Sequence, residues 1–191
     1  MSVEIVNSAL RLLQQRELAS LDDDNAVARL MRNAYPVARD EVTVTYEWGD
    51  AITRTTLAAD STAPAFGYDY QYRVPTDCLR VLTINYNGLS DTLITDYQRE
   101  GRFILTDQTA PLYVRYLRQI DDPNDISPLF KKAIACALAV ANGRKLTGKS
   151  SYINEARLQY REALNEAKRV DQLSTGAKTP KANHLLQARV Q

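Results

Sequence analysis

The stretch that decides the fold is 127-SPLFKKAIACALAVANGRKLTGKSS-151, because its second half fits two different local structures. Gly143, Gly148, Lys149 and Ser150 occupy the fixed positions of G-x-x-x-x-G-K-S, the phosphate-binding loop of nucleotide hydrolases. The same residues also suit the turn between two helices. The segment before Gly143 distinguishes these interpretations, since a working phosphate loop follows a buried β-strand.

That preceding segment predicts a helix. Ser127 is a suitable N-cap, and Pro128 suits the first helical position. Apolar side chains then recur with the helical period, at Phe130, Ile134, Ala137, Leu138 and Ala141. No hydrophobic strand that ends in an aspartate lies nearby to supply a magnesium ligand. We therefore interpret the motif as a helix–turn–helix and expect neither a bound nucleotide nor another cofactor.

Within a helical hairpin the motif residues have structural roles. Gly148 suits the left-handed position that ends the first helix, and Ser150 or Ser151 would cap the second. Lys145 and Lys149 lie near a helix C-terminus, where positive charge is favourable. The second helix has its own apolar stripe, at Tyr152, Ala156, Tyr160, Ala163, Leu164 and Ala167.

Two further amphipathic helices are expected at the N-terminal end. The first covers residues 3–13 with Ser2 as its N-cap. The second follows the aspartates of 22–24, which we expect to cap it, since the alternating ligands and the glycine of a calcium loop are missing. Pro36 should kink or end this helix. Residues 37–48 fit a helix or a strand, and periodicity alone does not decide between them.

Between residues 52 and 120 the apolar period becomes two, which predicts a small antiparallel β region. Strands are expected in "YDYQYRV", "RVLTINYNG", "RFILT" and "PLYVRYL", with Asn87-Gly88 as a hairpin signal. Tyrosines interleaved with arginine can stack on bases. Residues 42–126 carry 12 acids and 7 bases, however, and this acidic balance favours half-buried strand faces or protein interfaces instead.

The composition argues against several classes of site. The single His184 and the separated Cys78 and Cys136 form neither a zinc site nor a triad, and we expect both cysteines to be small buried hydrophobes. A carboxylate pair for glycosidic cleavage stays open, because 23 acids are present and nothing selects two of them. Neither a signal peptide nor a membrane span is recognisable, which predicts a soluble protein made in a cytoplasm.

Residues 174–191 contain no acid and read as a flexible basic tail with a short adhesive end. Its basic and apolar positions are the candidate partner-binding residues, Lys178, Lys181, Leu185, Leu186, Arg189 and Val190. Plain disorder is the alternative for this tail. The hairpin region 127–173 is also basic, with 9 bases and 4 acids.

The predicted fold class is therefore α+β. A bundle of about four helices comprises two N-terminal helices (1–48) and a C-terminal helical hairpin (123–173). A small antiparallel β insertion occupies 49–122, and the flexible tail occupies 174–191.

Four phrases in this order resemble a known family. They are "SALRLLQQRELASLDDDNAVARLMRNAYPVARDEV", "FGYDYQYRVPTDCLRVL", "EGRFILTDQTAPLYVRYL" and "DPNDISPLFKKAIACALAVANGRKLTGKSS" with the later "YREALNEAKRVD". Over residues 4–173 the chain resembles the head-to-tail adaptors of tailed bacteriophages, called tail tubular protein A in short-tailed phages. The most specific part is the aromatic alternation that runs into Val74-Pro75-Thr76-Asp77-Cys78-Leu79-Arg80, followed by Gly101-Arg102, a strand and Asp107.

The resemblance implies a structural, non-enzymatic protein of the virion neck, assembled in the host cytoplasm. Such adaptors form a homo-oligomeric ring, usually of twelve copies, beneath the portal protein. Their helical part meets the portal, their β part faces the next tail component (a nozzle or tail tube protein), and genomic DNA passes through the channel without sequence-specific binding. It also implies a helix for residues 37–45, and a tail that orders on the portal.

Two other classes stay open from the residues alone. One is an enzyme, either a nucleotide hydrolase or a cell-wall glycosidase with two unidentified carboxylates. The other is a small DNA-binding regulator that uses the basic hairpin.

Overall fold

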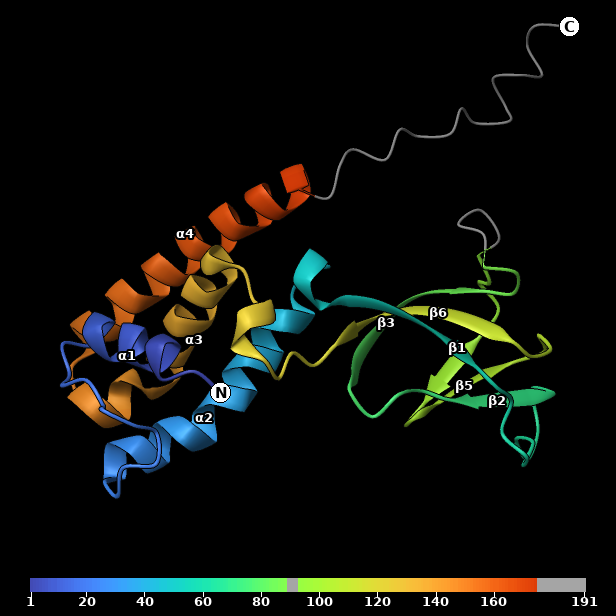
Figure 1. Cartoon of the computed structure of the whole chain (residues 1–191), viewed down its shortest axis with the longest axis horizontal. Coiled ribbons are helices and arrows are strands. Elements are labelled where there is room, and N and C mark those ends of the chain that lie inside the picture. Colours follow the sequence, from blue (N-terminus) through green and yellow to red (C-terminus); the bar gives the residue numbers. More distant parts are fainter. Residues whose placement is uncertain (89–92, 175–191) are drawn as a thin grey trace, which may run out of the picture.

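The computed structural model describes residues 1–88 and 93–174. Helices form one end of an elongated molecule and strands the other, as Figure 1 shows. The helices are α1 (Val3–Leu12), α2 (Ala26–Val44), α3 (Pro128–Thr147) and α4 (Ser150–Ser174), with short 3₁₀ turns at Gly49–Ala51 and Pro123–Asp125. The predicted α+β class with four helices is confirmed.

The two N-terminal helices begin at side-chain caps. The hydroxyl of Ser2 accepts from the amide of Ile5 at 3.5 Å, as the sequence predicts. The cap of α2 is Asn25, whose Oδ1 accepts from the amide of Ala28 at 2.8 Å, so the prediction that the aspartates cap this helix is wrong. Asn25 immediately precedes the first helical residue, and its side chain therefore reaches the free amides of the first turn. Asp24 instead pairs with Arg29.

The second helix continues through Pro36 to Val44, so the proline does not end it. The helix implied for residues 37–45 is confirmed as far as Val44. A proline inside a helix costs about 3 kcal/mol, chiefly through one lost hydrogen bond and a steric clash. Burial on both sides of it offsets this cost, because Tyr35, Ala38 and Val42 are all at most 2% exposed.

Helix α3 is the central helix and packs against α1, α2 and α4. Phe130, Ile134 and Leu138 of the predicted stripe are buried, whereas Ala141 is exposed. The expectation of a single apolar stripe is wrong, because further small side chains are buried around the helix, namely Ala133, Ala135, Cys136, Ala139, Asn142 and Gly143. Their small size lets three helices approach the same axis closely.

The strands form two antiparallel three-stranded sheets. One has the order β1-β6-β3, from Ile52–Leu57, Leu112–Arg118 and Cys78–Asn85. The other has the order β2-β5-β4, from Tyr70–Arg73, Phe103–Thr106 and Gln98–Glu100. The reversal expected at Asn87-Gly88 is short: the chain returns antiparallel to the end of β3 through the Asn85–Leu93 bridge and a hydrogen bond from the amide of Ile94 to the carbonyl of Ile84 at 2.8 Å. The long partner of β3 is β6. A turn signal predicts a local reversal of the chain, but it does not determine which strand pairs with β3 along most of its length.

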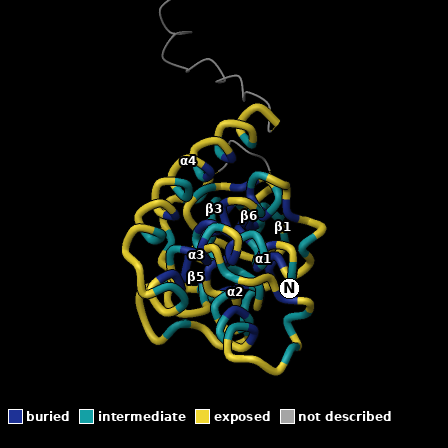
Figure 2. The backbone as a smooth tube through the Cα atoms, turned by 90° about the vertical axis from the view of Figure 1, so that its left-hand side faces the viewer, coloured by how far each residue is buried: buried dark blue, intermediate teal, exposed yellow. Residues whose placement is uncertain are grey.

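Each end of the molecule has its own apolar core. The β core contains Tyr72, Ile84, Ile104, Leu112 and Val114, among others. The helical core also takes in residues from outside the helices, and these are Leu13, Leu18, Trp48, Ala51, Leu117, Ile120 and Ile126. In Figure 2 the buried positions of the helical end lie inside and the exposed ones form the outer turns of the tube. None of the described helices combines the length and apolarity needed to cross a membrane.

Candidate functional site

The phosphate-loop residues lie at the junction of two helices. Gly143 lies inside α3, and Gly148 ends it with a left-handed φ of 66°, its amide bonded to the carbonyl of Arg144 at 3.1 Å. Ser150 is the first residue of α4 rather than its N-cap, and the amide of Lys149 donates to Oγ1 of Thr147 at 3.1 Å. A helix, not a strand, therefore leads into this turn, so its amides do not form the cradle of a phosphate loop.

Gly143 has a packing role that the sequence did not reveal. A Cβ at this position would lie 3.1 Å from Cγ1 of Ile153 and 3.2 Å from Cδ2 of Leu13. The glycine therefore allows both α4 and the end of α1 to pack closely against α3 at the same position along its axis. The signal was present as a glycine within a strong helical pattern, which usually marks a close approach.

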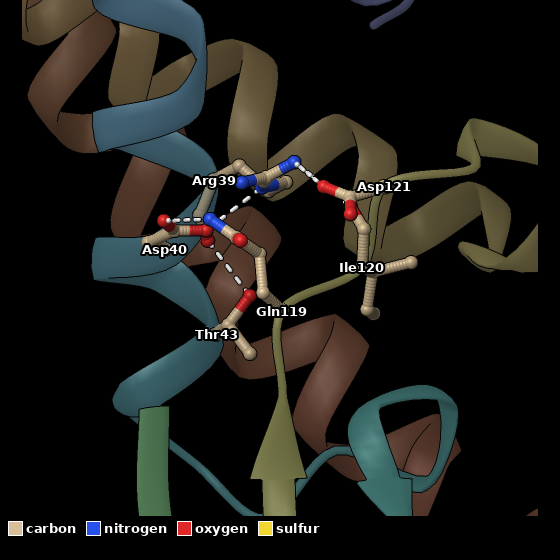
Figure 3. Close-up of polar contacts among 6 residues, drawn as sticks. All are labelled: Arg39, Asp40, Thr43, Gln119, Ile120 and Asp121. Carbon is tan, nitrogen blue, oxygen red and sulfur yellow. Dashed lines mark hydrogen bonds and ion pairs between the residues drawn. The ribbon is translucent and has the colours of Figure 1, made fainter. Parts of the chain in front are cut away.

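A buried arginine joins the two ends of the molecule (Figure 3). Arg39 of α2 is only 6% exposed, and its Nε lies 2.7 Å from Oδ1 of Asp40. Its Nη1 donates to the carbonyl of Ile120 and to Oδ1 of Asp121, both at 3.0 Å. Gln119 closes the cluster by donating to Oδ2 of Asp40 at 2.8 Å.

This Arg39 cluster is a structural junction. A buried guanidinium needs paired charges and hydrogen-bond acceptors, and here two carboxylates and a carbonyl supply them. Gln119, Ile120 and Asp121 follow the end of β6 at Arg118, so the cluster fixes the position of this connection against α2. Arg80 reinforces the junction by donating to the carbonyl of Val44 at 3.0 Å. Sequence reasoning missed it because Arg39 and Asp121 are 82 residues apart.

A groove of about 480 Å³ lies between α1 and α3, with Gln159 of α4 at its side. Its floor is apolar, formed by Ile5, Leu12, Ala135 and Cys136. Its rim is mainly basic, with Arg11, Lys131 and Lys132 against Glu4. An apolar floor with a charged rim is typical of a site that receives an apolar side chain from a partner.

A second hollow of about 520 Å³ lies over the sheet β1-β6-β3 and is more polar. Arg54 and Arg115 lie opposite each other in the β1–β6 register, and threonines of β1 and β3 surround them. Like charges in directly opposite positions are unfavourable. Glu47 offsets this repulsion, because its Oε2 lies 3.1 Å from Nη1 of Arg115.

The strongest exposed apolar feature is Phe66, in the connection between β1 and β2, which is 88% exposed. Leu173 near the end of α4 follows at 74%, and Val37 on α2 at 56%. These side chains are separate from one another in sequence and element. Exposed aromatic rings commonly serve as anchors at protein interfaces.

Acidic side chains and cysteine thiols are the candidate groups for metal binding and nucleophilic chemistry. Within the ranges 1–88 and 93–174, no group of three or more His, Cys, Asp or Glu side chains is placed to hold a metal ion. Burial raises the pKa of the Cys136 thiol, which is 1% exposed as expected. Burial also raises the pKa of Cys78, although that residue is only half-buried, so the expectation that both cysteines are fully buried is wrong for Cys78.

The candidate tail residues lie outside the described part of the chain, as does His184. They are Lys178, Lys181, Leu185, Leu186, Arg189 and Val190. In comparisons with known proteins, no family model matches this chain and no curated protein matches it.

Proposed function

We propose that this chain is a head-to-tail adaptor of a tailed bacteriophage, a structural ring component between the portal and the tail. The observation that carries the proposal is the order of the described elements, two helices, an antiparallel β part, and a helical hairpin. The four phrases that resemble the adaptor family fall on these elements in the same order. The proposal is for a non-enzymatic protein without metal or cofactor.

The shape and charge of the chain support this proposal. A ring component must present two different side surfaces that fit each other, which is a heterologous contact. The chain has a basic hairpin, with 9 bases and 4 acids over residues 127–173, and an acidic middle, with 12 acids and 7 bases over residues 42–126. Opposite charges on two parts of one chain favour association of neighbouring copies in a fixed orientation.

The proposed partners follow from the resemblance to the adaptor family. Copies of the chain form the ring, usually of twelve in the adaptor family, with the helical end against the portal and the β end toward a nozzle or tail tube protein. Genomic DNA passes through the channel. The tail of residues 174–191 docks on the portal, with Leu185, Leu186 and Val190 as anchors and its basic residues steering the encounter. The protein belongs to the virion neck after assembly in the host cytoplasm.

The test is direct imaging of the assembly. The purified chain is mixed with the portal ring encoded by the same phage genome, and particles are class-averaged by electron microscopy. We expect a regular extra tier beneath the portal, which weakens when the chain ends at residue 173. A portal that stays bare, while circular dichroism shows the chain folded, would overturn the proposal. A tier that the shortened chain forms equally well would overturn only the role of the tail.

A further inference from the structure

Phe66 lies in a surface loop whose ends are held by hydrogen bonds. The loop, residues 58–69, is closed at its base by the amide of Asp60, which donates to the carbonyl of Gln71 at 2.8 Å. Oδ1 of Asp60 accepts from the amide of Thr62 at 3.1 Å, and the amide of Asp69 donates to Oδ1 of Asp107 at 2.9 Å. These hydrogen bonds fix the two ends of the loop, and between them the Phe66 side chain is 88% exposed.

The groove between α1 and α3 offers what such a ring needs. Its apolar floor would remove the ring from water, and about 480 Å³ accommodates a phenyl ring with the small Pro64 and Ala65 beside it. Burying one aromatic side chain removes about 150–250 Å² of its surface from solvent. A single aromatic anchor in a pocket commonly dominates the energy of an interface.

The charges of the two features are complementary. The loop carries Asp60 and Asp69 and no basic residue. The groove rim carries Arg11, Lys131 and Lys132 beside Glu4. Arg11 pairs with Glu17 and Lys132 with Glu166, which leaves Lys131 as the main cation facing the groove. Lys131 makes no ion pair with any residue in the part of the chain described by the structure, so it is available to a carboxylate from outside.

The loop cannot reach the groove of its own chain. It connects β1 to β2 at the β end of the elongated molecule, whereas α1 and α3 lie at the helical end (Figure 1). We propose that Phe66 of one copy seats in the α1–α3 groove of a neighbouring copy, with its acidic loop against the basic rim. The contact rests on the proposed function, since it would link successive copies of the ring heterologously.

Charge disfavours the other segment of the chain that could fill the groove. Residues 174–191 contribute Lys178, Lys181 and Arg189 and no acid, so a docked tail would bring like charges against Arg11 and Lys131. The acidic loop of a neighbouring copy carries negative charge, and its Phe66 is a larger apolar side chain than any in the tail. Seating of the tail, or of the portal, in the groove is an alternative outcome of the test.

The test places a photo-crosslinking aromatic residue, benzoylphenylalanine, at position 66. Mixed unlabelled and ¹⁵N-labelled chains, free at high concentration and bound to the portal, are irradiated and analysed by mass spectrometry. We expect crosslinks between labelled and unlabelled chains that map to α1 or to the first half of α3. Crosslinks that map elsewhere, to the portal or within one chain, would overturn the contact. So would the absence of crosslinks in both settings.

Variants test the two halves of the contact separately. Phe66→Ser and Lys131→Glu should each lower the yield of inter-chain crosslinks from a second reporter, benzoylphenylalanine at the exposed rim position Glu4, by about tenfold, the effect of losing an interface anchor. The matched controls Tyr86→Ser and Arg157→Glu change exposed residues of the same types outside the contact and should leave the crosslink yield unchanged. Asp69→Lys combined with Lys131→Glu should restore part of the loss. Equal losses in the controls would overturn the assignment.

The outcomes separate this contact from the proposed function. A tier on the portal that persists with crosslinks outside the groove overturns the contact and leaves the adaptor function standing. Crosslinks in the groove together with a bare portal show the contact and overturn the adaptor function.

Discussion

Tyr116 lies on β6 and donates its hydroxyl hydrogen to Asp77, with 3.2 Å between the hydroxyl oxygen and Oδ1. The side chain is only 5% exposed. Burial, followed by the charge of Asp77 and the hydrogen bond to it, raises the pKa of Tyr116 to about 12 from the ordinary 10.0. The fold therefore holds this phenol protonated, and it connects the corner between β2 and β3 to the central strand of the sheet.

Replacing Tyr116 by Phe should lower the free energy of unfolding at neutral pH by about 1.5–3 kcal/mol, because the hydrogen bond to a carboxylate is lost. Because the folded pKa is raised, the contribution of Tyr116 is fully present below pH 10 and is lost as the pH rises through about 12. The difference between wild type and Tyr116→Phe should therefore narrow over that range. Urea unfolding at a series of pH values measures it. A constant difference up to pH 12 would contradict this assignment.

At the scale of elements, α3 determines the helical end. It begins with Pro128 at its first position and ends at the left-handed Gly148, both as the sequence predicts. Between them it is buried against three other helices, and Trp48 stacks on Phe130 with ring centroids 4.5 Å apart. The point of closest approach to α1 and α4 is Gly143.

We expect Gly143→Leu to destabilise the protein by about 1–3 kcal/mol, the usual cost of overpacking a core. The added atoms would overlap Ile153 and Leu13, which already lie 3.1 and 3.2 Å from a Cβ at this position. Gly143→Ala should be close to neutral, because a gain of about 1 kcal/mol in helix propensity opposes the tight contact. The matched control is Ala141→Leu, on the exposed face of the same helix. Thermal unfolding followed by circular dichroism tests the series, and equal effects at both positions would contradict the spacer role.

At the scale of the whole molecule, two cores are held together by a narrow junction. Leu117 of β6 is fully buried in the helical core, so the last strand enters both ends of the molecule. The Arg39 cluster and the bond from Arg80 to Val44 fix the angle at which it does so. Such a junction should make the two ends unfold together. If either end unfolded alone, the other would lose the burial of Leu117 and the hydrogen bonds of Arg39 and Arg80.

Arg39→Met should lower the free energy of unfolding by about 2–3 kcal/mol, because it leaves Asp40 and the carbonyl of Ile120 without their buried partner. The control Arg29→Met removes an exposed ion pair and should cost less than 1 kcal/mol. Fluorescence of Trp48, the single tryptophan, reports the helical core. Hydrogen exchange of β6 reports the other end. In the wild type both should report one transition, and β6 exchanging while Trp48 stays buried would contradict the coupling.

The candidate site was only partly predictable from the sequence. The turn at Gly148 follows from a local helical pattern and a glycine, and both are readable in order along the chain. The α1–α3 groove and the exposed ring of Phe66 were not predicted, because exposure depends on which surfaces remain uncovered after packing. The tail residues that the sequence singled out, Lys178 to Val190, remain a prediction.

The sequence by itself determined most of the element types, the acidic middle segment, the basic hairpin segment and the helix–turn–helix of residues 127–151. These properties follow from side-chain periodicity and from capping residues within a few positions of each other. Only the tertiary structure decided that α2 continues through Pro36, that β3 pairs with β6, and that Arg39 meets Asp121. The physical reason is that each of these depends on contacts between distant segments, whose burial and hydrogen bonding outweigh the local preference.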